Sequence, residues 1–423
     1  MWIDHLQRIG ALRAAVERLP WVSLAWALLA CGEPARAPAP RAARLPDIEL
    51  VESVPIETAL DHPDVRDAAV VWPEMIDRAK KTIEFEEFYA SDVEAGPSAL
   101  TPTLDAIDRA VKRGVKVRFL ADSVMAPKYP ATLDRLRGMG VEVRILECKP
   151  RYGGVQHAKF IVVDTSESFV GSQNFDWRAL QHIQEIGVLV RSKSVAGGLV
   201  DIFDTDWALA DPSTPSTTRV HAHPTPSGLY ASPADWLPDP CIGDLAQLVS
   251  MIDGAKTSLS LQVLTYSTKM RDKSEFTTLD SSLRRAAARG VKLRVLVSSW
   301  GVKPGTHELA SVQALSKVPN VEVKFLTVPP WSGGEIPFAR VTHAKFLIVD
   351  QDTAWIGTSN WEGDYFLKTR NVAIVTDSKN VVPKLARIFE DDWAPTYSQP
   401  VPAPRDVKDE PAAPPSDSGP APP

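Results

Sequence analysis

The sequence predicts an α/β protein in which two duplicated α-β-α domains pack about a pseudo-twofold axis and share one active site. A short signature, His-x-Lys-x4-Asp-x6-Gly-[Ser/Thr]-x-Asn, occurs twice, and the second histidine, His343, follows the first, His157, by 186 residues. The same offset separates Trp207 from Trp393 at the ends of matching segments, so the duplication extends well past the signature. A period of this length indicates a duplicated domain rather than a solenoid repeat.

Local patterns predict the same order of elements in both halves. Gly114 and Gly290 each follow an amphipathic segment and suit the C-terminal cap of a helix. The segments behind the two histidines, 160–163 and 346–349, are short apolar runs typical of strands in a covered sheet. We therefore expect a strand, a helix and a second strand in each half, at 82–89, 104–113 and 115–121 and again at 259–266, 279–289 and 291–297.

Length and composition fit two globular domains with flexible ends. The chain has 423 residues, of which 44% are hydrophobic and 24% charged. The net charge of −6 argues against a generally basic protein that coats nucleic acid, although a local basic cleft stays possible. The predicted division is a signal peptide at 1–31, a linker at 32–47, a first domain at 48–212, an interdomain linker at 213–236, a second domain at 237–398 and a disordered tail at 399–423.

The N-terminus is typical of an export signal. Three arginines precede the apolar run 21–30, which ends at Cys31 in a segment that resembles the bacterial lipobox, where the cysteine is lipidated after cleavage. The run is too short to span a bilayer. We expect an exported, membrane-anchored lipoprotein of the cell envelope, with a secreted protein as the alternative. A plain amphipathic helix or a wrongly assigned start codon also stays open.

Neither the cysteines nor the linker histidines predict a metal site. Cys148 and Cys241 either form one disulfide between the halves of an exported protein or remain two buried free thiols. His221 and His223 lie in the proline-rich linker, but no cysteine or carboxylate cluster accompanies them. The sequence therefore predicts no metal and no cofactor, and it leaves the oligomeric state open.

The repeated signature contains residue types that suit phosphodiester chemistry. Two histidines can supply a nucleophile and a proton donor, while two lysines and two asparagines can bind the phosphate oxygens. Each histidine and its lysine are two residues apart and so lie on one face of a strand. The predicted catalytic residues are His157, Lys159, Asp164, His343, Lys345 and Asp350, and the predicted phosphate-binding residues are Lys159, Asn174, Lys345 and Asn360, with the hydroxyls of Ser172 and Thr358.

The paired signature resembles that of the phospholipase D superfamily, over about residues 48–398. The segments GSQNFDWRAL and IPFARVTHAKF are similar to those of animal lysosomal phospholipase D-like 5′-exonucleases and related poxvirus envelope proteins. The resemblance implies a phosphohistidine intermediate that water or an alcohol displaces. It implies the 5′ ends of single-stranded nucleic acid as substrate, with phospholipids as the alternative. Because no motif position is missing, a catalytically inactive phosphate-binding protein is the less favoured hypothesis.

Two residues at equal spacing predict the roles of the histidines. Glu185 lies 28 residues after His157, and Asn371 lies 28 residues after His343. A carboxylate hydrogen-bonded to an imidazole orients the ring and makes its other nitrogen more basic than an amide does. We therefore predict that Glu185 pairs with His157, which is the nucleophile, and that His343 is the general acid. The two motif aspartates are expected to hold the backbone of the opposite half or the lysines.

Aromatic and acidic residues near the motifs leave the choice of substrate open. The aromatic side chains can stack on bases or pack in the core, and the core is the better prediction for most of them. A glutamate that faced the cleft would favour a cationic head group, although alternating side chains cannot all face inward. The aromatic residues are Trp177, Trp331, Trp355, Trp361 and Tyr365, and the glutamates are Glu84, Glu86 and Glu87.

Overall fold

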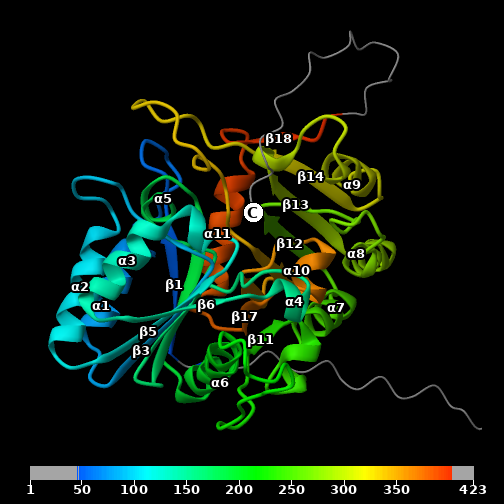
Figure 1. Ribbon diagram of the computed structural model, residues 1–423. Helices are drawn as coiled ribbons and strands as arrows, with labels where there is room; N and C mark the ends of the chain where they lie inside the picture. The colour runs from blue at the N-terminus through cyan, green and yellow to red at the C-terminus, as the bar shows by residue number, and fades with distance from the viewer. Residues whose placement is uncertain (1–44, 46, 403–423) are drawn as a thin grey trace, which may run out of the picture. The chain divides into compact units, whose positions relative to one another are not determined.

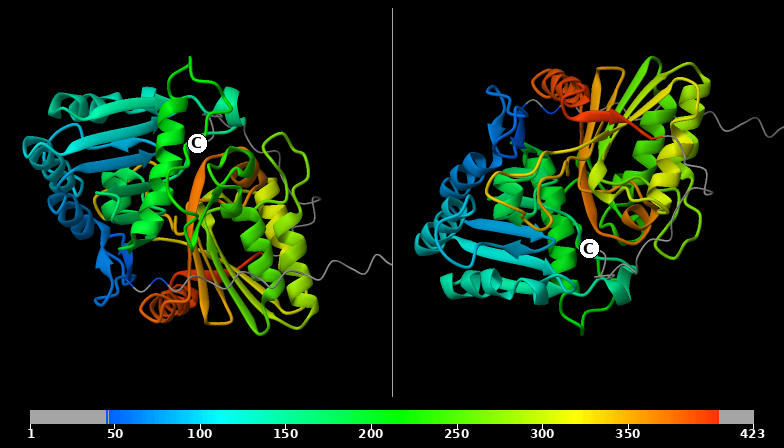
Figure 2. Two further views of the ribbon diagram at one scale, coloured as in Figure 1. Left: turned by 90° about the horizontal axis from the view of Figure 1, so that it is seen from below. Right: turned by 90° about the horizontal axis from the view of Figure 1, so that it is seen from above.

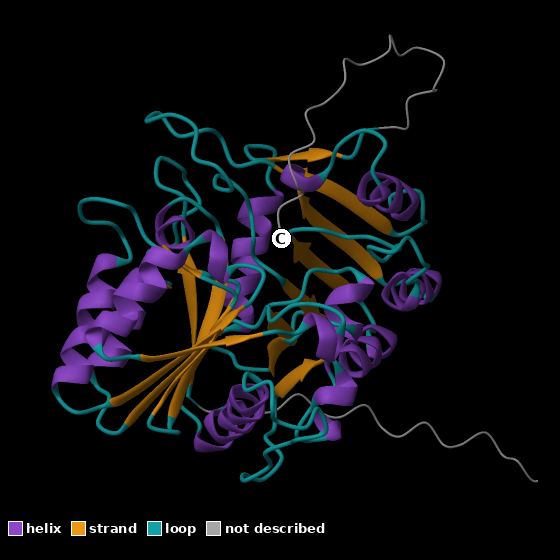
Figure 3. Cartoon of the chain, in the orientation of Figure 1, coloured by secondary structure: helices purple, strands orange, loops and turns teal. Residues whose placement is uncertain are grey.

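The computed structural model describes residue 45 and residues 47–402. The predicted signal peptide, the lipidation site at Cys31 and residues 403–423 of the predicted tail lie outside this part of the chain. Inside it, no helix is both long enough and apolar enough to cross a membrane. The described chain is built around two eight-stranded sheets, each flanked by helices (Figure 3).

The first sheet has the strand order β2-β1-β10-β8-β7-β3-β5-β6. Strands β3, β5 and β6 run parallel, and the strands from β7 to β1 join them through antiparallel pairs. The apolar run predicted at 160–163 forms β7, which is buried in the middle of the sheet. The strands are β1 (Ile48–Ser53), β2 (Arg66–Asp67), β3 (Thr82–Glu87), β5 (Lys116–Asp122), β6 (Glu142–Leu146), β7 (Phe160–Val163), β8 (Glu167–Gly171) and β10 (Glu185–Val190).

Helices α1, α2 and α3 lie on one face of the first sheet, and α6 lies on the other (Figure 2). Helix α2 has Pro102 in its first turn and ends next to Gly114, whose φ of 87° suits a residue without a side chain. The helices are α1 (Ala68–Asp77), α2 (Thr101–Lys112), α3 (Pro130–Met139), α4 (Lys149–Tyr152), α5 (Trp177–Gln181) and α6 (Lys193–Leu209), and a small separate sheet pairs β4 (Ala90–Ser91) with β9 (Phe175–Asp176).

The second half repeats this arrangement (Figure 1). Its sheet has the order β11-β17-β16-β15-β12-β13-β14-β18, so the six strands from β17 to β14 correspond one by one to β10 through β6. The shared strand order shows that the duplication in the sequence is also a duplication of the fold. The elements are α7 (Asp244–Gly254), α8 (Thr278–Ala288), α9 (His307–Leu315), α10 (Gly363–Leu367), α11 (Val382–Trp393), β11 (Leu229–Ser232), β12 (Ser258–Val263), β13 (Lys292–Ser298), β14 (Val321–Leu326), β15 (Phe346–Val349), β16 (Thr353–Gly357), β17 (Asn371–Thr376) and β18 (Ser398–Pro400).

Two segments that were predicted to be irregular contain strands. Strand β11 lies inside the predicted interdomain linker at 213–236 and pairs with β17. Strand β18 runs into the predicted tail, which was expected to begin at residue 399, and pairs with β14. Both strands cover an edge of the second sheet and satisfy its backbone N–H and C=O groups. Short segments of this kind are set by the edge they cover, so their own sequence does not reveal them.

One hydrophobic core joins the two halves. It contains the buried faces of α6 and α11 together with residues from both sheets, among them Phe160 of β7 and Phe346 of β15. Two further cores belong to one half each and pack the sheets against the helices α1 to α3 and α7 to α9. The shared core therefore places the first residues of both motif strands at the junction of the halves.

Both described cysteines are free. Cys148 is buried and Cys241 is exposed, so the predicted disulfide is absent and the alternative of two buried thiols holds for Cys148 alone. His223, from the predicted linker, shares a 2.8 Å hydrogen bond with Asp201 of α6. In the part of the chain that the structure describes, no group of three or more histidine, cysteine or carboxylate side chains is placed to hold a metal ion.

Candidate active site

The two motif histidines lie just before β7 and β15. In each half the lysine two residues later is buried, and its Nζ donates to the backbone carbonyl of the histidine, at 2.6 Å for Lys159 and 2.5 Å for Lys345. This hydrogen bond fixes each lysine beside its own histidine. Because an ammonium group has three donors, each lysine can still donate to a phosphate oxygen.

Both half-sites open into one cavity of about 300 Å³. His157 and Asn174 from the first half and His343 and Asn360 from the second half line it, so the structure brings the two motifs together. Both asparagines are buried, and their Oδ1 atoms have no hydrogen-bond partner among the described residues. Buried polar atoms without a partner are suited to meet a polar ligand. No carboxylate side chain is among the described residues that line the cavity.

Each histidine is held by a residue of the opposite half. Nδ1 of His157 lies 3.0 Å from Oδ1 of Asn371, and Nδ1 of His343 lies 2.8 Å from Oε2 of Glu185. The predicted pairing of Glu185 with His157 is therefore wrong. The backbone N–H of His157 donates to the carbonyl of the residue before Asn371, and that of His343 to the carbonyl of the residue before Glu185. The starts of β10 and β17 thus cross to the motif of the other half.

The hydrogen bonds around Asn371 define the tautomer of His157. The Nδ2 group of Asn371 donates to the carbonyls of Tyr365, at 2.8 Å, and Thr369, at 3.3 Å. Its Oδ1 accepts from the hydroxyl of Thr358 at 2.9 Å, so Oδ1 is the atom that faces His157. The imidazole must then carry its proton on Nδ1, which leaves a lone pair on Nε2. A neutral imidazole of this form is a nucleophile.

The two imidazoles differ in how readily they take up a proton. Burial and the ammonium groups of Lys159 and Lys345 hold the pKa of His157 well below its usual value. Burial also lowers the pKa of His343, but the carboxylate of Glu185 opposes this effect. Of the two rings, His343 therefore more readily carries a proton.

Burial changes the charge of the motif lysines as well. It lowers the pKa of Lys345 to about 7. Burial together with the nearby ammonium group of Lys345 holds the pKa of Lys159 well below its ordinary value, although the carboxylates of Glu87 and Glu185 oppose this. Neither lysine lines the cavity, but each is held next to a histidine that does. The negative charge of a phosphodiester bound there favours the charged forms of both amines.

The motif aspartates lie away from the cavity, at the far ends of the motif strands. Asp164 accepts the backbone N–H groups of residues 80–82 at 2.9, 2.7 and 3.0 Å. Asp350 accepts those of residues 256–258 in the same way. The predicted catalytic role and the predicted contacts with the opposite half or the motif lysines are therefore wrong, because each aspartate holds the backbone of its own half. A four-residue strand, about 13 Å long, separates each aspartate from its histidine and lysine.

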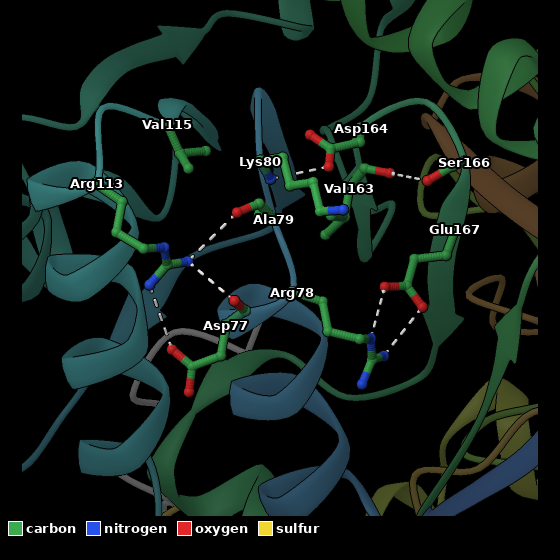
Figure 4. Close-up of a pocket in the computed structure, with 10 residues that line it drawn as sticks. All are labelled: Asp77, Arg78, Ala79, Lys80, Arg113, Val115, Val163, Asp164, Ser166 and Glu167. Carbon is green, nitrogen blue, oxygen red and sulfur yellow. Dashed lines mark hydrogen bonds and ion pairs between the residues drawn. The ribbon is translucent and has the colours of Figure 1, made fainter.

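Asp164 borders a larger hollow on the surface, of about 760 Å³, which Figure 4 shows. The guanidinium groups there are paired within the hollow. Arg78 lies 3.0 Å from Glu167, and Arg113 lies 3.6 Å from Asp77. Because its arginines are neutralised locally and neither histidine reaches it, this hollow is not the candidate site.

The hydroxyls of Ser172 and Thr358 form hydrogen bonds within the protein, next to the site. The Oγ of Ser172 donates to the carbonyl of Ile186 at 3.2 Å and accepts the N–H of the same residue at 3.0 Å. The hydroxyl of Thr358 donates to Asn371, as described above, and neither hydroxyl lines the cavity. Their predicted role as phosphate ligands is wrong, because Ser172 is hydrogen-bonded to the backbone of Ile186 and Thr358 to the side chain of Asn371.

Most of the aromatic residues singled out from the sequence lie elsewhere. Trp355 and Trp361 are buried in the core of the second half, and the ring of Tyr365 is 5.0 Å from that of His157 behind the cavity. None of the three glutamates of β3 lines the cavity. The adjacency of β3 to β7 could have pointed to Phe88, which follows β3 directly. The aromatic residues that do line the cavity are Phe88, Tyr89, Tyr129, Trp300 and Phe338.

A protein-family profile described as "Cardiolipin synthase, PLD-like domain" matches residues 73–207 and again residues 248–393. The chain belongs to the phospholipase D superfamily. Each match contains one motif, and the predicted fold of two duplicated phospholipase D-like α/β domains is confirmed.

Similar proteins include enzymes named for two kinds of substrate. The mouse 5'-3' exonuclease PLD4 is 31% identical over 395 residues, which are 82% of this chain and 78% of the relative. Probable phospholipase D F09G2.8 of Caenorhabditis elegans is 32% identical over 391 residues, 83% of this chain and 70% of the relative. The virion nicking-joining enzyme of vaccinia virus is 31% identical over 357 residues, 78% and 83%. The resemblance to exonuclease and poxvirus members is confirmed.

A solved structure supports the same fold. Phosphatidylserine synthase of Haemophilus influenzae superposes with a TM-score of 0.55 over 78% of this chain and 85% of that chain. The sequences are 12% identical, so this likeness concerns the fold alone.

Proposed function

We propose that this phospholipase D-like chain is a hydrolase that cleaves phosphodiester bonds through a phosphohistidine formed on His157. The observation that carries the proposal is the shared cavity, where a neutral imidazole and a more readily protonated one face the same space. Membership of the family supports the same chemistry. The intact second motif gives the chain both histidines that two-step displacement needs.

The reaction follows from the proton on each ring. In the first step Nε2 of His157 attacks phosphorus, the bond from phosphorus to the leaving oxygen breaks, and His343 gives its Nε2 proton to that oxygen. In the second step His343, now neutral, accepts a proton from water, and the resulting hydroxide attacks phosphorus. The bond from phosphorus to nitrogen breaks, which restores free His157 and releases a phosphate monoester.

The motif lysines and asparagines bind the phosphate in this account. Lys159 and Lys345 can donate to the non-bridging oxygens, on which negative charge grows in the transition state. Asn174 and Asn360 line the cavity and can turn their Nδ2 groups toward the same oxygens. Their burial strengthens these interactions, because the surroundings are poor in water.

Single-stranded nucleic acid is the substrate that we propose. The name of the mouse relative, a 5'-3' exonuclease, supports a nucleic acid substrate. The cavity supports it too, since its described lining has aromatic rings and Lys128 but no carboxylate that would repel a polyanion. Phospholipid is the second candidate, supported by the name of the Caenorhabditis elegans relative.

Export is part of the proposal, and it rests on the sequence of residues 1–31. We propose that the enzyme is anchored to the cell envelope through Cys31 and acts there. Substitution of Cys31 with serine should move the enzyme from the membrane fraction to the soluble fraction. Unchanged membrane association of the variant would contradict the anchor.

A direct assay tests the proposed chemistry and substrate together. The purified protein is given a 5′-hydroxyl single-stranded oligonucleotide, bis-p-nitrophenyl phosphate or phosphatidylcholine, each in the presence of a chelator. We expect the oligonucleotide and the p-nitrophenyl ester to be cleaved, and H157N to cleave neither. Choline release that outpaces shortening of the strand would replace nucleic acid by lipid. Activity that a chelator abolishes and a divalent ion restores would contradict the mechanism.

A further inference from the structure

An exposed aromatic ring stands at the cavity in a strained backbone conformation. Phe338 lines the cavity, yet 50% of its surface is exposed. Its φ is 60°, in the left-handed region that bulky residues rarely occupy. Residues held in such conformations concentrate at functional sites, because the surrounding structure must compensate for their cost. Packing does not account for the position of this ring.

The segment around Phe338 is tied to the first half. The guanidinium group of Arg340 donates to the carbonyls of Pro329 and Ile56, both at 2.8 Å. The backbone N–H of Arg340 donates to His182 at 2.9 Å. The bonds to Ile56 and His182 join the second-half segment to the first half two residues after Phe338, so the ring is presented by a fixed backbone.

A second aromatic surface lines the same cavity from the first half. The rings of Tyr129 and Tyr89 are 5.0 Å apart with an interplanar angle of 26°, which is a stacked arrangement. The guanidinium carbon of Arg178 lies 5.4 Å from the centre of the Tyr129 ring. Arg178 also donates to the carbonyl of Pro337 at 3.3 Å, directly before Phe338. One arginine therefore connects the tyrosine pair to the Phe338 segment.

We propose that Phe338 and Tyr129 form a stacking site for a nucleobase next to the scissile phosphate. The inference rests on the proposed function and deepens it, because it names the part of a single strand that this enzyme recognises. Aromatic rings from both halves line the cavity and can stack on any base, so the site selects unpaired bases without selecting sequence. His157 and His343 line the same cavity, so a base held there lies beside the reacting phosphate.

The proposal is tested with two strands that differ only in the bases flanking the scissile phosphate. One oligonucleotide carries normal nucleotides, and its partner has abasic sites on both sides of the scissile phosphate. The wild-type enzyme should show a kcat/KM about 5- to 50-fold higher on the normal strand, as expected for loss of base stacking. F338A should lose a similar factor on the normal strand and little on the abasic one. F338Y should restore the preference, because it keeps the ring.

Val70 provides a matched control. It is an exposed apolar residue, 48% exposed, in α1 and outside the cavity lining. V70A should leave both rates unchanged, and Y129A should repeat the selective loss seen in F338A. An equal loss on both strands in F338A, or no loss at all, would overturn the stacking site while leaving the nuclease intact. Failure of the wild-type enzyme to cleave either strand, with choline released from phosphatidylcholine, would instead overturn the proposed function.

Discussion

The two half-sites share a backbone but differ in the partner of the histidine. Each histidine precedes a matching strand, and its Nδ1 is held by the first residue of β10 or β17 from the other half. That residue is an amide, Asn371, for His157 and a carboxylate, Glu185, for His343. The duplicated fold supplies two equal positions, and one substitution makes their protonation unequal. A two-step displacement needs this inequality, because one ring must attack and the other must donate a proton.

The surroundings of the rings differ in the same direction. The rings of Phe88 and Tyr365 each lie 5.0 Å from that of His157. The residues that match them in the other half, Leu264 and Ala179, are aliphatic. Aromatic packing on two sides keeps water from His157 and favours its neutral form. The roles that we propose for the two histidines are those predicted from the sequence, but the reason is the opposite one: the carboxylate is the partner of the proposed acid and not of the proposed nucleophile.

Removal of either histidine should have the largest effect. H157N should abolish turnover on every substrate, since no other described side chain takes its place in the cavity. H343N should slow oligonucleotide cleavage by at least about 10²- to 10⁴-fold, the usual contribution of a general acid. With bis-p-nitrophenyl phosphate the loss in the first step should be much smaller, because p-nitrophenolate leaves without a proton. Equal first-step losses on both substrates would contradict the role of His343 as acid.

Substitution of Glu185 should change how the activity depends on pH. In E185Q nothing opposes the lowering of the His343 pKa by burial, so less of this ring is protonated at neutral pH. Activity needs protonated His343, so its fall with rising pH should begin at a lower pH than in the wild type. We expect a loss of about 10- to 100-fold at pH 7 on the oligonucleotide. A pH profile of unchanged shape would show that Glu185 acts by position alone.

Replacement of Asn371 by a carboxylate should shift the acidic limb of the pH profile, where activity rises with pH. N371D gives His157 a carboxylate partner, which raises the pKa of this ring from its lowered value. The nucleophile is active only when neutral, so the rise of activity with pH should begin at a higher pH than in the wild type. N371A is the control for the lost hydrogen bond. If N371D kept the wild-type profile, the neutral state of His157 would not depend on its partner.

Two buried contacts at the junction of the halves offer a comparison for stability. Arg370 pairs with Asp206 at 2.6 Å, and both side chains are fully buried. At the matching positions Gln184 lies 2.8 Å from Asp392. D206N leaves a buried guanidinium unpaired and should lower the free energy of unfolding by about 3–5 kcal/mol, as measured by urea denaturation. A loss below about 1 kcal/mol would show that the backbone carbonyls around Arg370 suffice.

Removal of the charge of Asp392 should raise the free energy of unfolding, whereas the change at Asp206 lowers it. Burial raises the pKa of its carboxyl group from 3.8 to about 7. The unfolded chain loses this proton near pH 4 and the folded protein only near pH 7, so stability falls as pH rises between these values. D392N removes the penalty and should be more stable than the wild type at pH 8, with the difference shrinking toward pH 4. Equal stability at both pH values would contradict the raised pKa.

Sequence patterns predicted the parts of this molecule that are local or repeated. The spacing of His157 and His343 predicted a shared site, and the apolar runs after them predicted the central strands. The partner of each histidine could not be predicted, because a 28-residue spacing says nothing about a chain that crosses to the other half. Asp164 was misjudged for a related reason. A motif aspartate can serve to accept the backbone N–H groups of a neighbouring turn, and spacing alone does not distinguish that role from catalysis.

Phe338 could not be predicted either. It lies in a segment without regular structure, and its position depends on hydrogen bonds from Arg340 and Arg178 to distant backbone carbonyls. The edge strands β11 and β18 show the same limit, since they form where another strand needs a partner. Contacts between distant segments decide these features, and composition and periodicity carry no record of them.

The position of the covalent phosphate shows directly which histidine is the nucleophile. H343N is mixed with bis-p-nitrophenyl phosphate, quenched in base and digested, and the peptides that contain each motif are analysed by mass spectrometry. The variant can form the adduct but lacks the base that activates water, so the phosphoryl ester should accumulate on His157. The same treatment of H157N should give no adduct. A phosphoryl group on His343 in the wild-type enzyme would contradict the assignment and show that the carboxylate partner marks the nucleophile.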